Sequence, residues 1–301
     1  MIECRAPKSK NEFKNYYYLR WQILRSPWQQ PQGSEQDTLE KQAIHRGIFD
    51  DNENALAIGR LHFNDQFRAQ IRYMAVAENE QGKGFGQALL AELEQEANIR
   101  GAQSIELQAR ESAIPFYQRA GYVIIEKTHL MYGEIQHYAM KKELVLLPEH
   151  NMESAKALQK KWHSTIPISE VMNIAISYFD QQQLVTHCEP TVNKNLHNTM
   201  FAGSIYTLAT LTGWGWVYLL LQQHQCAGDI VLAEGSIKYL APIEGVVCAK
   251  ANIDHVKTNT EIFANNRKIK IHIDVDVLSG DIIAAKFSGQ YVVLMKEPST
   301  C

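Results

Sequence analysis

An uncharged segment in the C-terminal half places the strongest constraint on how this chain can fold. From Asn195 to Gly228 the sequence contains no Asp, Glu, Lys or Arg, and the stretch MFAGSIYTLATLTGWGWVYLLLQQ within it is long enough to cross a bilayer as a helix. Glycine, serine and threonine interrupt that stretch and no cluster of Lys or Arg flanks it, which is not typical of a membrane span. We therefore predict a helix at about 201–223 that lies buried at the centre of a soluble domain, and no membrane partner.

The composition is that of an ordinary globular protein with enough apolar residues to form a core. The 301 residues are 45% hydrophobic and 21% charged, with a formal net charge of −3. Charge is nearly balanced in both halves, so the basic surface that nucleic-acid binding requires is not expected. Five widely spaced cysteines without metal-ligand spacing, and an N-terminus without an apolar export segment, predict reduced thiols in the cytoplasm and no bound metal.

Two regions with different patterns follow one another, separated by the polar stretch LPEHNMES at 147–154. The first alternates strand-like and helix-like segments and predicts an α/β domain over residues 1–147. Its expected helices cover 11–28, 85–100 and 112–120, and its strands cover 1–5, 55–63, 68–77, 104–107, 122–127 and 136–144. The second region, residues 151–298, predicts an α+β domain in which an antiparallel sheet wraps around the apolar helix. Its other expected elements are a helix at 155–163 and strands at 171–178, 183–189, 229–240, 246–254, 267–277 and 282–294.

A glycine-rich turn between a strand and a helix marks the first region. The turn is Gln81-Gly82-Lys83-Gly84-Phe85-Gly86, and a turn of this kind lets backbone N–H groups approach a phosphate at the positive end of a helix. Together with the segment AIPFYQRAGY at 113–122, this order of motifs resembles the GNAT acetyltransferases. The resemblance implies that the turn binds the pyrophosphate of acetyl-CoA or CoA, and that the strand Met74-Ala75-Val76 offers backbone hydrogen bonds to the pantetheine arm.

The same resemblance assigns a role to Tyr117, which matches the family tyrosine that protonates the departing CoA thiolate. A phenol with an ordinary pKa of ~10 stays protonated at neutral pH, as that role requires. Packing on the inner face of its helix is the alternative interpretation. Glu78, Glu106 and His137 are candidates for the general base, and the acceptor substrate is left open.

A second set of motifs surrounds the start of the apolar helix. The loop NKNLHNT at 193–199 leads into MFAGS at 200–204, and a later strand ends in IKYLAP at 237–242. This arrangement resembles the hot dog fold, whose members act on acyl thioesters of CoA or acyl carrier protein. The N–H groups of the first helical turn, near Ala202 and Gly203, suit an oxyanion hole for the thioester oxygen. The resemblance implies a site between two subunits and therefore a homodimer.

The chemistry of this loop favours decarboxylation over hydrolysis. Hydrolysis of a thioester needs an activated water or a nucleophile, yet the loop and the helix contain no acidic residue after Asn195. Glu234, on the following strand, is the candidate base for a thioesterase. Decarboxylation of a malonyl thioester needs only stabilisation of the enolate oxygen in a poorly hydrated pocket, which amide and backbone N–H groups provide.

The complete arrangement resembles the proteobacterial YiiD/MadA (FabY) family of malonyl-acyl carrier protein decarboxylases, because of the loop motif and of LATLTGWG at 208–215. This resemblance implies that the C-terminal domain converts malonyl-acyl carrier protein into acetyl-acyl carrier protein for priming of fatty acid synthesis, without a metal or redox cofactor. The family's catalytic asparagine matches Asn195. Asn193 and His197 are further catalytic candidates, and bracing of the loop is the alternative role for Asn193. Gly203 belongs to the expected oxyanion site.

Two interpretations stay open for some residues. Either helix packing or the wall of a substrate tunnel suits Trp214, Trp216 and Tyr218. Either attraction of an acidic carrier protein or protection of a sheet edge suits Arg267, Lys268 and Lys270. Three other functions also fit the motifs: an acyl thioesterase, a GNAT acetyltransferase whose hot dog domain serves dimerisation, and an acyl-CoA-binding protein without turnover.

Overall fold

The structure is a computed structural model that describes residues 3–64, 68–144, 149–180, 182–252 and 268–295. The chain divides into two compact units, Met1–Leu146 and Leu147–Cys301, and each unit has its own sheet. None of the helices within the described ranges, the apolar helix included, combines the length and the hydropathy needed to cross a bilayer.

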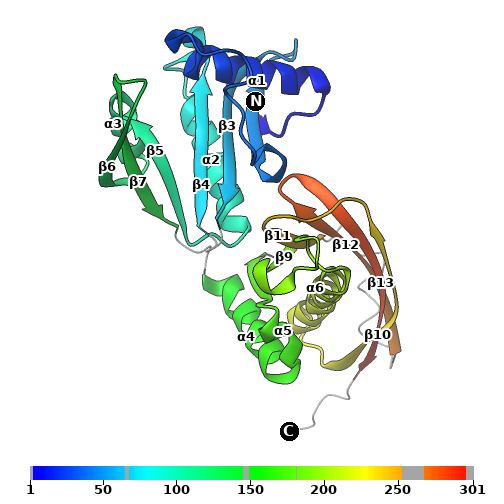
Figure 1. The fold of residues 1–301 in the computed structure, drawn as a ribbon. Coiled ribbons are helices and arrows are strands. Elements are labelled where there is room, and N and C mark those ends of the chain that lie inside the picture. The colour runs from blue at the N-terminus through cyan, green and yellow to red at the C-terminus, as the bar shows by residue number, and fades with distance from the viewer. Residues whose placement is uncertain (1–2, 65–67, 145–148, 181, 253–267, 296–301) are drawn as a thin grey trace. The chain divides into compact units, whose positions relative to one another are not determined.

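A seven-stranded sheet forms the N-terminal unit, in the order β1-β2-β3-β4-β5-β7-β6 (Figure 1). Its strands are β1 (Cys4–Arg5), β2 (Ile44–Phe49), β3 (Ala55–Phe63), β4 (Ala69–Val76), β5 (Ser104–Arg110), β6 (Val123–Met131) and β7 (Ile135–Glu143). Its α-helices are α1 (Lys10–Leu24), α2 (Phe85–Ile99) and α3 (Ile114–Arg119), and short 3-10 turns lie at Ser26–Trp28, Glu40–Gln42, Glu78–Glu80 and Glu111–Ala113.

The two long helices of this unit cover opposite faces of the sheet. α2 belongs to the core that contains Ala57 and Leu61 of β3, whereas α1 packs with Ile58 of the same strand. Successive residues of a strand point to opposite faces, so these neighbours in sequence separate the two cores. The neighbouring strands β4 and β5 of this sheet pair at one end and then diverge.

That divergence follows from the pairing of β4 with β5. The parallel pairing covers only the three residue pairs from Ala69↔Ile105 to Ile71↔Leu107. Two residues further along β4, Tyr73 adopts a left-handed φ of 56°, and the register of β3 against β4 shifts between Ile58 and Arg60. A bulge of this kind re-aims the side chains around it.

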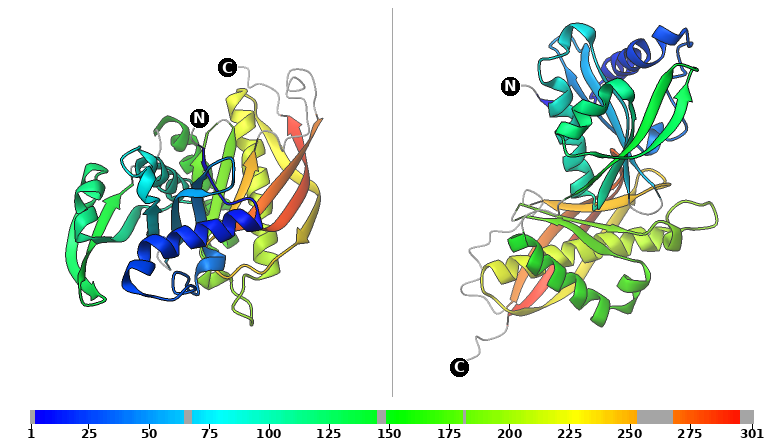
Figure 2. Two further views of the ribbon diagram at one scale, coloured as in Figure 1. Left: turned by 90° about the horizontal axis from the view of Figure 1, so that it is seen from above. Right: turned by 90° about the vertical axis from the view of Figure 1, so that its left-hand side faces the viewer.

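A six-stranded antiparallel sheet wraps around the helix α6 (Ala202–Gln223) in the C-terminal unit, as Figures 1 and 2 show. The order of the strands is β10-β13-β12-β11-β9-β8. They are β8 (Ala175–Phe179), β9 (Gln183–Cys188), β10 (Gly228–Tyr239), β11 (Val247–Asn252), β12 (Lys268–Ser279) and β13 (Ile282–Met295), and α4 (Glu149–Thr165) and α5 (Pro167–Val171) precede them. Buried side chains occur on all sides of α6, as predicted for a helix at the centre of a domain.

Close contact between α6 and α4 gives a first testable prediction. A β-carbon on Gly215 would lie 2.5 Å from Cζ2 of Trp162, whose side chain is fully buried. We expect Gly215→Ala to lower the free energy of unfolding by about 1–3 kcal/mol, because the buried ring has no free space to move into. Urea denaturation measures this change. Gly86→Ala in α2 is the matched control, since its β-carbon would meet only ordinary contacts of 3.5 Å or more. Equal effects of the two substitutions would contradict the packing described here.

In the N-terminal unit, β5 and β6 continue to Arg110 and Met131, beyond their predicted ends at 107 and 127. Two larger departures have a clear physical cause. The helix predicted over 11–28 ends at Leu24, and Pro27 lies in a separate 3-10 turn, because a proline disfavours helical conformation in the residue before it. The strand β2 was not predicted. Its centre carries His45 and Arg46, and these polar residues interrupt the apolar pattern although both are buried.

Two further corrections concern the start of the C-terminal unit. The strand predicted over 171–178 begins only at Ala175, because residues 167–171 form α5 with Pro167 in its first turn. The polar stretch 147–154, expected as a linker, is helical from Glu149; residues 147 and 148 lie outside the described part of the chain. A polar helical face next to solvent lacks the apolar periodicity that the prediction required.

Candidate functional site

The loop between β9 and α6 closes on itself through Asn195. The backbone N–H of Asn195 donates to the carbonyl of Thr199 (2.8 Å), and its Oδ1 accepts the N–H groups of His197 (2.8 Å) and Thr199 (3.3 Å). Its Nδ2 donates to Thr199 Oγ1 (2.9 Å). A side-chain amide nitrogen carries two hydrogens. The second hydrogen of this half-buried group therefore has no partner among the described residues.

Asn193 and His197 lie in the same loop but in different environments. Asn193 is only 2% exposed, and its Nδ2 donates to the carbonyls of Met172 (3.0 Å) and Glu189 (2.7 Å). It fixes the loop to the end of α5 and to the residue after β9, so its side chain faces the interior of this chain. The His197 side chain is exposed. Of the three polar residues predicted here, only Asn195 has a side-chain amide that is fixed by hydrogen bonds within the loop and still has one N–H available for a ligand.

The helix α6 begins with unpaired backbone donors. No side chain caps it, and the N–H of Ile205 is the first to donate to a carbonyl at the helix start, that of Phe201 (3.1 Å). The N–H groups of Ala202, Gly203 and Ser204 thus have no partner among the described residues, at the positive end of the helix dipole. The Phe201 ring occupies the space that a β-carbon on Gly203 would need, which explains the glycine at this position.

The glycine-rich turn of the N-terminal unit exposes its backbone in the same way. Gly82 and Gly84 adopt left-handed φ angles of 78° and 87°, and both face open space. Gly84 caps α2 without a side-chain hydrogen bond, so the first N–H groups of that helix are free of side-chain caps. Lys83 and Gln81 are exposed, and the Lys83 ammonium contacts Glu80 Oε2 at 3.0 Å.

A cavity of about 700 Å³ lies beside this turn, between the diverging strands β4 and β5. Gln81 and Gly86 of the turn line it, together with Met74 and Val76 of β4 and Tyr117 of α3. The Tyr117 hydroxyl contacts Met74 Sδ at 3.6 Å. Burial raises the pKa of Tyr117 to about 12, so the phenol stays protonated and able to donate.

Family models match both units. The model of the acetyltransferase (GNAT) family matches residues 13–122, and the model described as "Putative thioesterase (yiiD_Cterm)" matches residues 155–295. A "putative thioesterase from Shewanella oneidensis" of known structure is 42% identical over 47% of this chain and 98% of its own, with a TM-score of 0.45. The chain belongs to the proteins that join a GNAT domain to a YiiD C-terminal domain.

Acetyltransferases are also among the similar proteins. The "Uncharacterized N-acetyltransferase YjcF" of Bacillus subtilis is 26% identical over 136 residues, which are 45% of this chain and 96% of that protein. The ribosomal-protein-S18-alanine N-acetyltransferase of Escherichia coli is 17% identical over 50% of this chain and 98% of its own, with a TM-score of 0.39. The predicted architecture, a GNAT domain followed by a thioesterase-like hot dog domain, is confirmed.

Hydrolysis of a thioester would need a carboxylate or a thiolate near the start of α6. Glu244 is exposed directly after Ile243, whose carbonyl accepts the N–H of Met200 (2.8 Å). Glu189 uses Oε1 to accept both the N–H (3.3 Å) and the hydroxyl (2.7 Å) of Thr191. Cys188 is fully buried, and burial raises the pKa of its thiol to about 12, which excludes a thiolate nucleophile. Glu234 is exposed on β10, one residue before Gly235, which faces Tyr206 of α6.

The position of Glu234 does not suit the role of hydrolytic base at the α6 start of the same chain. Neighbouring residues of a strand face opposite sides, so Glu234 points away from α6. Tyr239, whose hydroxyl donates to the carbonyl of Ala202 (3.0 Å), marks where β10 meets the helix start. Five residues of extended strand separate it from Glu234, roughly 16 Å.

In the GNAT domain, one of the three candidate bases lines the cavity. His137 stacks on His129 with ring centroids 4.7 Å apart, and its Nδ1 lies 3.0 Å from the carbonyl of Ile135. Burial lowers the pKa of His137, and nearby cations add to the effect, so the ring is neutral and able to accept a proton at neutral pH. Glu106 pairs with Arg68 (3.3 Å), Glu78 is exposed in a 3-10 turn, and neither lines the cavity.

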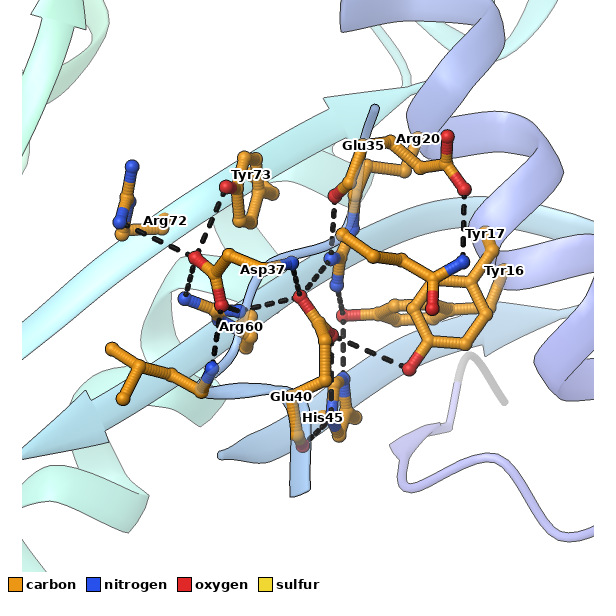
Figure 3. A network of polar contacts seen from close by, with 12 residues as sticks. Tyr16, Tyr17, Arg20, Glu35, Asp37, Glu40, His45, Arg60, Arg72 and Tyr73 are labelled. Atoms are coloured by element: carbon orange, nitrogen blue, oxygen red, sulfur yellow. Dashed lines mark hydrogen bonds and ion pairs between the residues drawn. The ribbon is translucent and has the colours of Figure 1, made fainter. Parts of the chain in front are cut away.

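A buried ionic network in the GNAT domain was not predicted (Figure 3). Arg20 and Arg60 are fully buried, and both contact Glu40 Oε1, at 2.8 and 2.5 Å. Arg60 also pairs with Asp37 (2.6 Å), which accepts the hydroxyl of Tyr73 (3.1 Å). Burial alone would raise the pKa of Asp37, but the hydrogen bonds and charge of Arg60 hold it well below its usual range. The one feature of the sequence that could have indicated this network is Arg60, which lies within the mostly apolar strand ALAIGRLHF.

The aromatic residues of α6 singled out above make packing contacts within this chain. Trp216 is 3% exposed and meets Phe179 edge to face. Trp214 stacks on Tyr218 with centroids 5.4 Å apart, and its Nε1 donates to the carbonyl of Ile230 (3.1 Å). The packing interpretation of these residues therefore agrees with the contacts they make.

Proposed function

We propose that the YiiD C-terminal domain decarboxylates malonyl-acyl carrier protein to acetyl-acyl carrier protein, which then primes fatty acid synthesis. One observation carries this proposal: the held amide of Asn195, with a hydrogen to spare, precedes the unpaired N–H groups of Ala202, Gly203 and Ser204. These are neutral donors, and the segment from Asn195 to Ser204 contains no carboxylate that would repel a malonyl anion.

The reaction uses such donors directly. The bond between the malonyl carboxylate and the adjacent carbon breaks, its electron pair moves toward the thioester carbonyl, and CO₂ leaves. The first-turn N–H groups stabilise the resulting enolate oxygen, while the Asn195 amide orients the carboxylate or shares the enolate charge. The enolate carbon then takes a proton from water, which gives the acetyl thioester.

Hydrolysis of the thioester is the alternative for this domain, as the family description suggests. It requires a base or nucleophile beside the donors. Within one chain Glu234 points away from α6 and Cys188 is inert, so hydrolysis has less support than decarboxylation.

Acyl carrier protein and a second copy of this chain are the proposed partners. Lys268 and Lys270 lie exposed on β12 and offer positive charge to an acidic carrier protein; Arg267 lies outside the described residues. The edge strand β10 and the residue after it expose the apolar side chains of Val231, Tyr239 and Leu240, which suits the homodimer implied by the hot dog fold.

For the GNAT domain we propose acetyl transfer from acetyl-CoA to an amine. The buried, protonated Tyr117 at the cavity favours this function, since it can protonate the departing CoA thiolate. His137 is placed to take the proton of the attacking amine. The glycine-rich turn, with Gly82 and Gly84 facing open space, is proposed to hold the pyrophosphate of CoA.

The test of the main proposal is incubation of the purified protein with malonyl-acyl carrier protein, with products resolved by intact mass. Acetyl-carrier protein with release of CO₂ is the expected result. Free carrier thiol without CO₂ would show a thioesterase instead. Unchanged malonyl-carrier protein would refute the decarboxylase and any hydrolysis of this substrate.

A further inference from the structure

Three arginines line the cavity of the GNAT domain. Arg25 from the end of α1, Arg72 from β4 and Arg110 from the end of β5 all line it, together with His129 and His137 of the β6–β7 hairpin. None of the described residues that line the cavity is an aspartate or glutamate. A pocket of this kind repels an amine that carries only positive charge and attracts an anion.

The neighbouring carboxylates do not balance these arginines. Four guanidinium groups surround the ring of Tyr73, with centroid distances of 4.6 Å (Arg20), 5.6 Å (Arg25), 4.9 Å (Arg60) and 5.0 Å (Arg72). Asp37 and Glu40 are the carboxylates that pair with arginines in this network, and they contact the fully buried Arg20 and Arg60 at 2.5–2.8 Å. Glu35, also drawn in Figure 3, accepts from Arg20 through its backbone carbonyl (3.1 Å).

Three arginines are left at the cavity with little or no neutralisation. Arg72 is exposed and reaches Asp37 only at 3.4 Å. Arg25 donates to the carbonyls of Ser34 and Leu24 and makes no ion pair among the described residues. Arg110 lies 4.5 Å from the centroid of Trp28 and likewise has no carboxylate partner in the described part of the chain. Burial, reinforced by the charge of Arg25, lowers the pKa of Arg110, as expected for a cation that lacks a counter-charge.

The backbone holds this cluster in place. Tyr73 adopts its left-handed φ at the bulge of β4, a conformation that is rare for residues other than glycine. Its ring lies among the four guanidinium groups and its hydroxyl donates to Asp37. The strain at this residue therefore accompanies a fixed array of positive charge at the divergence of β4 and β5.

We infer that the GNAT cavity binds an acceptor that carries a carboxylate or phosphate group beside its reactive amine, with Arg72, Arg110 and Arg25 holding the anion. This inference rests on the acetyl transfer proposed above for the same cavity. Guanidinium groups bind both carboxylate and phosphate through paired N–H donors, so the two chemistries share one site. The anionic group, held by these arginines, would orient the amine in the cavity that His137 and Tyr117 also line.

Equilibrium binding tests the site without requiring turnover. Full-length protein saturated with acetyl-CoA is titrated calorimetrically with succinate, with its neutral isostere succinamide and with inorganic phosphate. Succinate, phosphate or both are expected to bind at least about tenfold more tightly than succinamide. Arg72→Gln and Arg110→Gln are each expected to weaken anion binding by about tenfold or more, while the exposed Arg119→Gln, outside the cavity, leaves it unchanged.

Other outcomes overturn the inference. Equal binding of succinate and succinamide, or anion binding that survives both cavity substitutions, would show that no such site exists. An equal loss of acetyl-CoA affinity in the two variants would assign the arginines to the phosphates of CoA instead. Acetyl transfer to aspartate and to ethanolamine is measured separately: anion binding with no transfer to either refutes the proposed acetyltransferase, and binding of neither anion refutes the site.

Discussion

Replacing Asn195 with aspartate is expected to lower kcat/KM for decarboxylation of malonyl-acyl carrier protein by about 100- to 1000-fold. The substitution keeps an oxygen in the position that accepts the N–H groups of His197 and Thr199, so the loop retains its turn. It removes the amide donor and adds a negative charge that repels both the malonyl carboxylate and the developing enolate. Product formation followed by intact mass, with circular dichroism for the fold, measures the change.

A matched variant in the same loop separates chemistry from stability. Asn193→Ala removes two hydrogen bonds to the carbonyls of Met172 and Glu189 in a buried position, which is expected to lower the free energy of unfolding by about 2 kcal/mol. The folded fraction of this variant should keep most of its kcat. An Asn195→Asp enzyme with an unchanged rate would contradict the role given to Asn195, whatever the effect at Asn193.

Removing the charge of Glu40 is expected to produce the largest loss of stability in the GNAT domain. Glu40→Gln is nearly isosteric, yet it leaves Arg20 and Arg60, both fully buried, with Asp37 as their one remaining carboxylate in the network. Breaking a buried ion pair from one side costs about 3–5 kcal/mol, because the remaining charge stays desolvated. Urea denaturation of the full chain, monitored by a probe of the GNAT domain, measures the loss.

An exposed ion pair provides the control for Glu40. Glu80 contacts Lys83 at 3.0 Å, but the lysine side chain is 56% exposed, so Glu80→Gln is expected to change the free energy of unfolding by less than about 1 kcal/mol. A change of the same size in Glu40→Gln would mean that water reaches Arg20 and Arg60. In the double variant Arg20→Met/Glu40→Gln, part of the loss should be recovered, since the removed arginine pairs with Glu40 and with no other carboxylate among the described residues, whereas Arg60 keeps Asp37.

Predictions from the sequence succeeded where the signal was local. The strand at Ala55–Phe63, the helix at Phe85–Ile99 and the helix at Ala202–Gln223 lie within a few residues of their predicted bounds. Local signals mark them: an Asn-Asp turn after the strand, apolar spacing after a glycine-rich turn, and an uncharged apolar run. Predictions of secondary structure were wrong where polar residues are buried by contacts with distant parts of the chain. The buried His45 and Arg46 hid β2, whose polar side chains are tolerated only because other elements supply their partners.

The candidate sites show the same division. Asn195 and the turn at 81–86 were found from the sequence, because each is a contiguous motif. The sequence left open whether Asn193 faces a substrate or the interior of the domain. Its hydrogen bond to Met172, 21 residues away, shows that it faces the interior. The sequence did not indicate that three arginines line the cavity, because Arg25, Arg72 and Arg110 lie in separate segments and none belongs to a recognisable motif.

The sequence by itself determined the order of the two domains, the class of each fold and the two helix starts that expose backbone donors. These properties depend on the periodicity of apolar residues and on glycines at particular turns, and both are short-range. Only the tertiary structure decided that Glu234 faces away from α6, that His137 rather than Glu78 or Glu106 lines the cavity, and that three arginines meet there. The direction of a side chain and the balance of charge around it depend on residues that are distant in the chain and become neighbours only when the sheet forms.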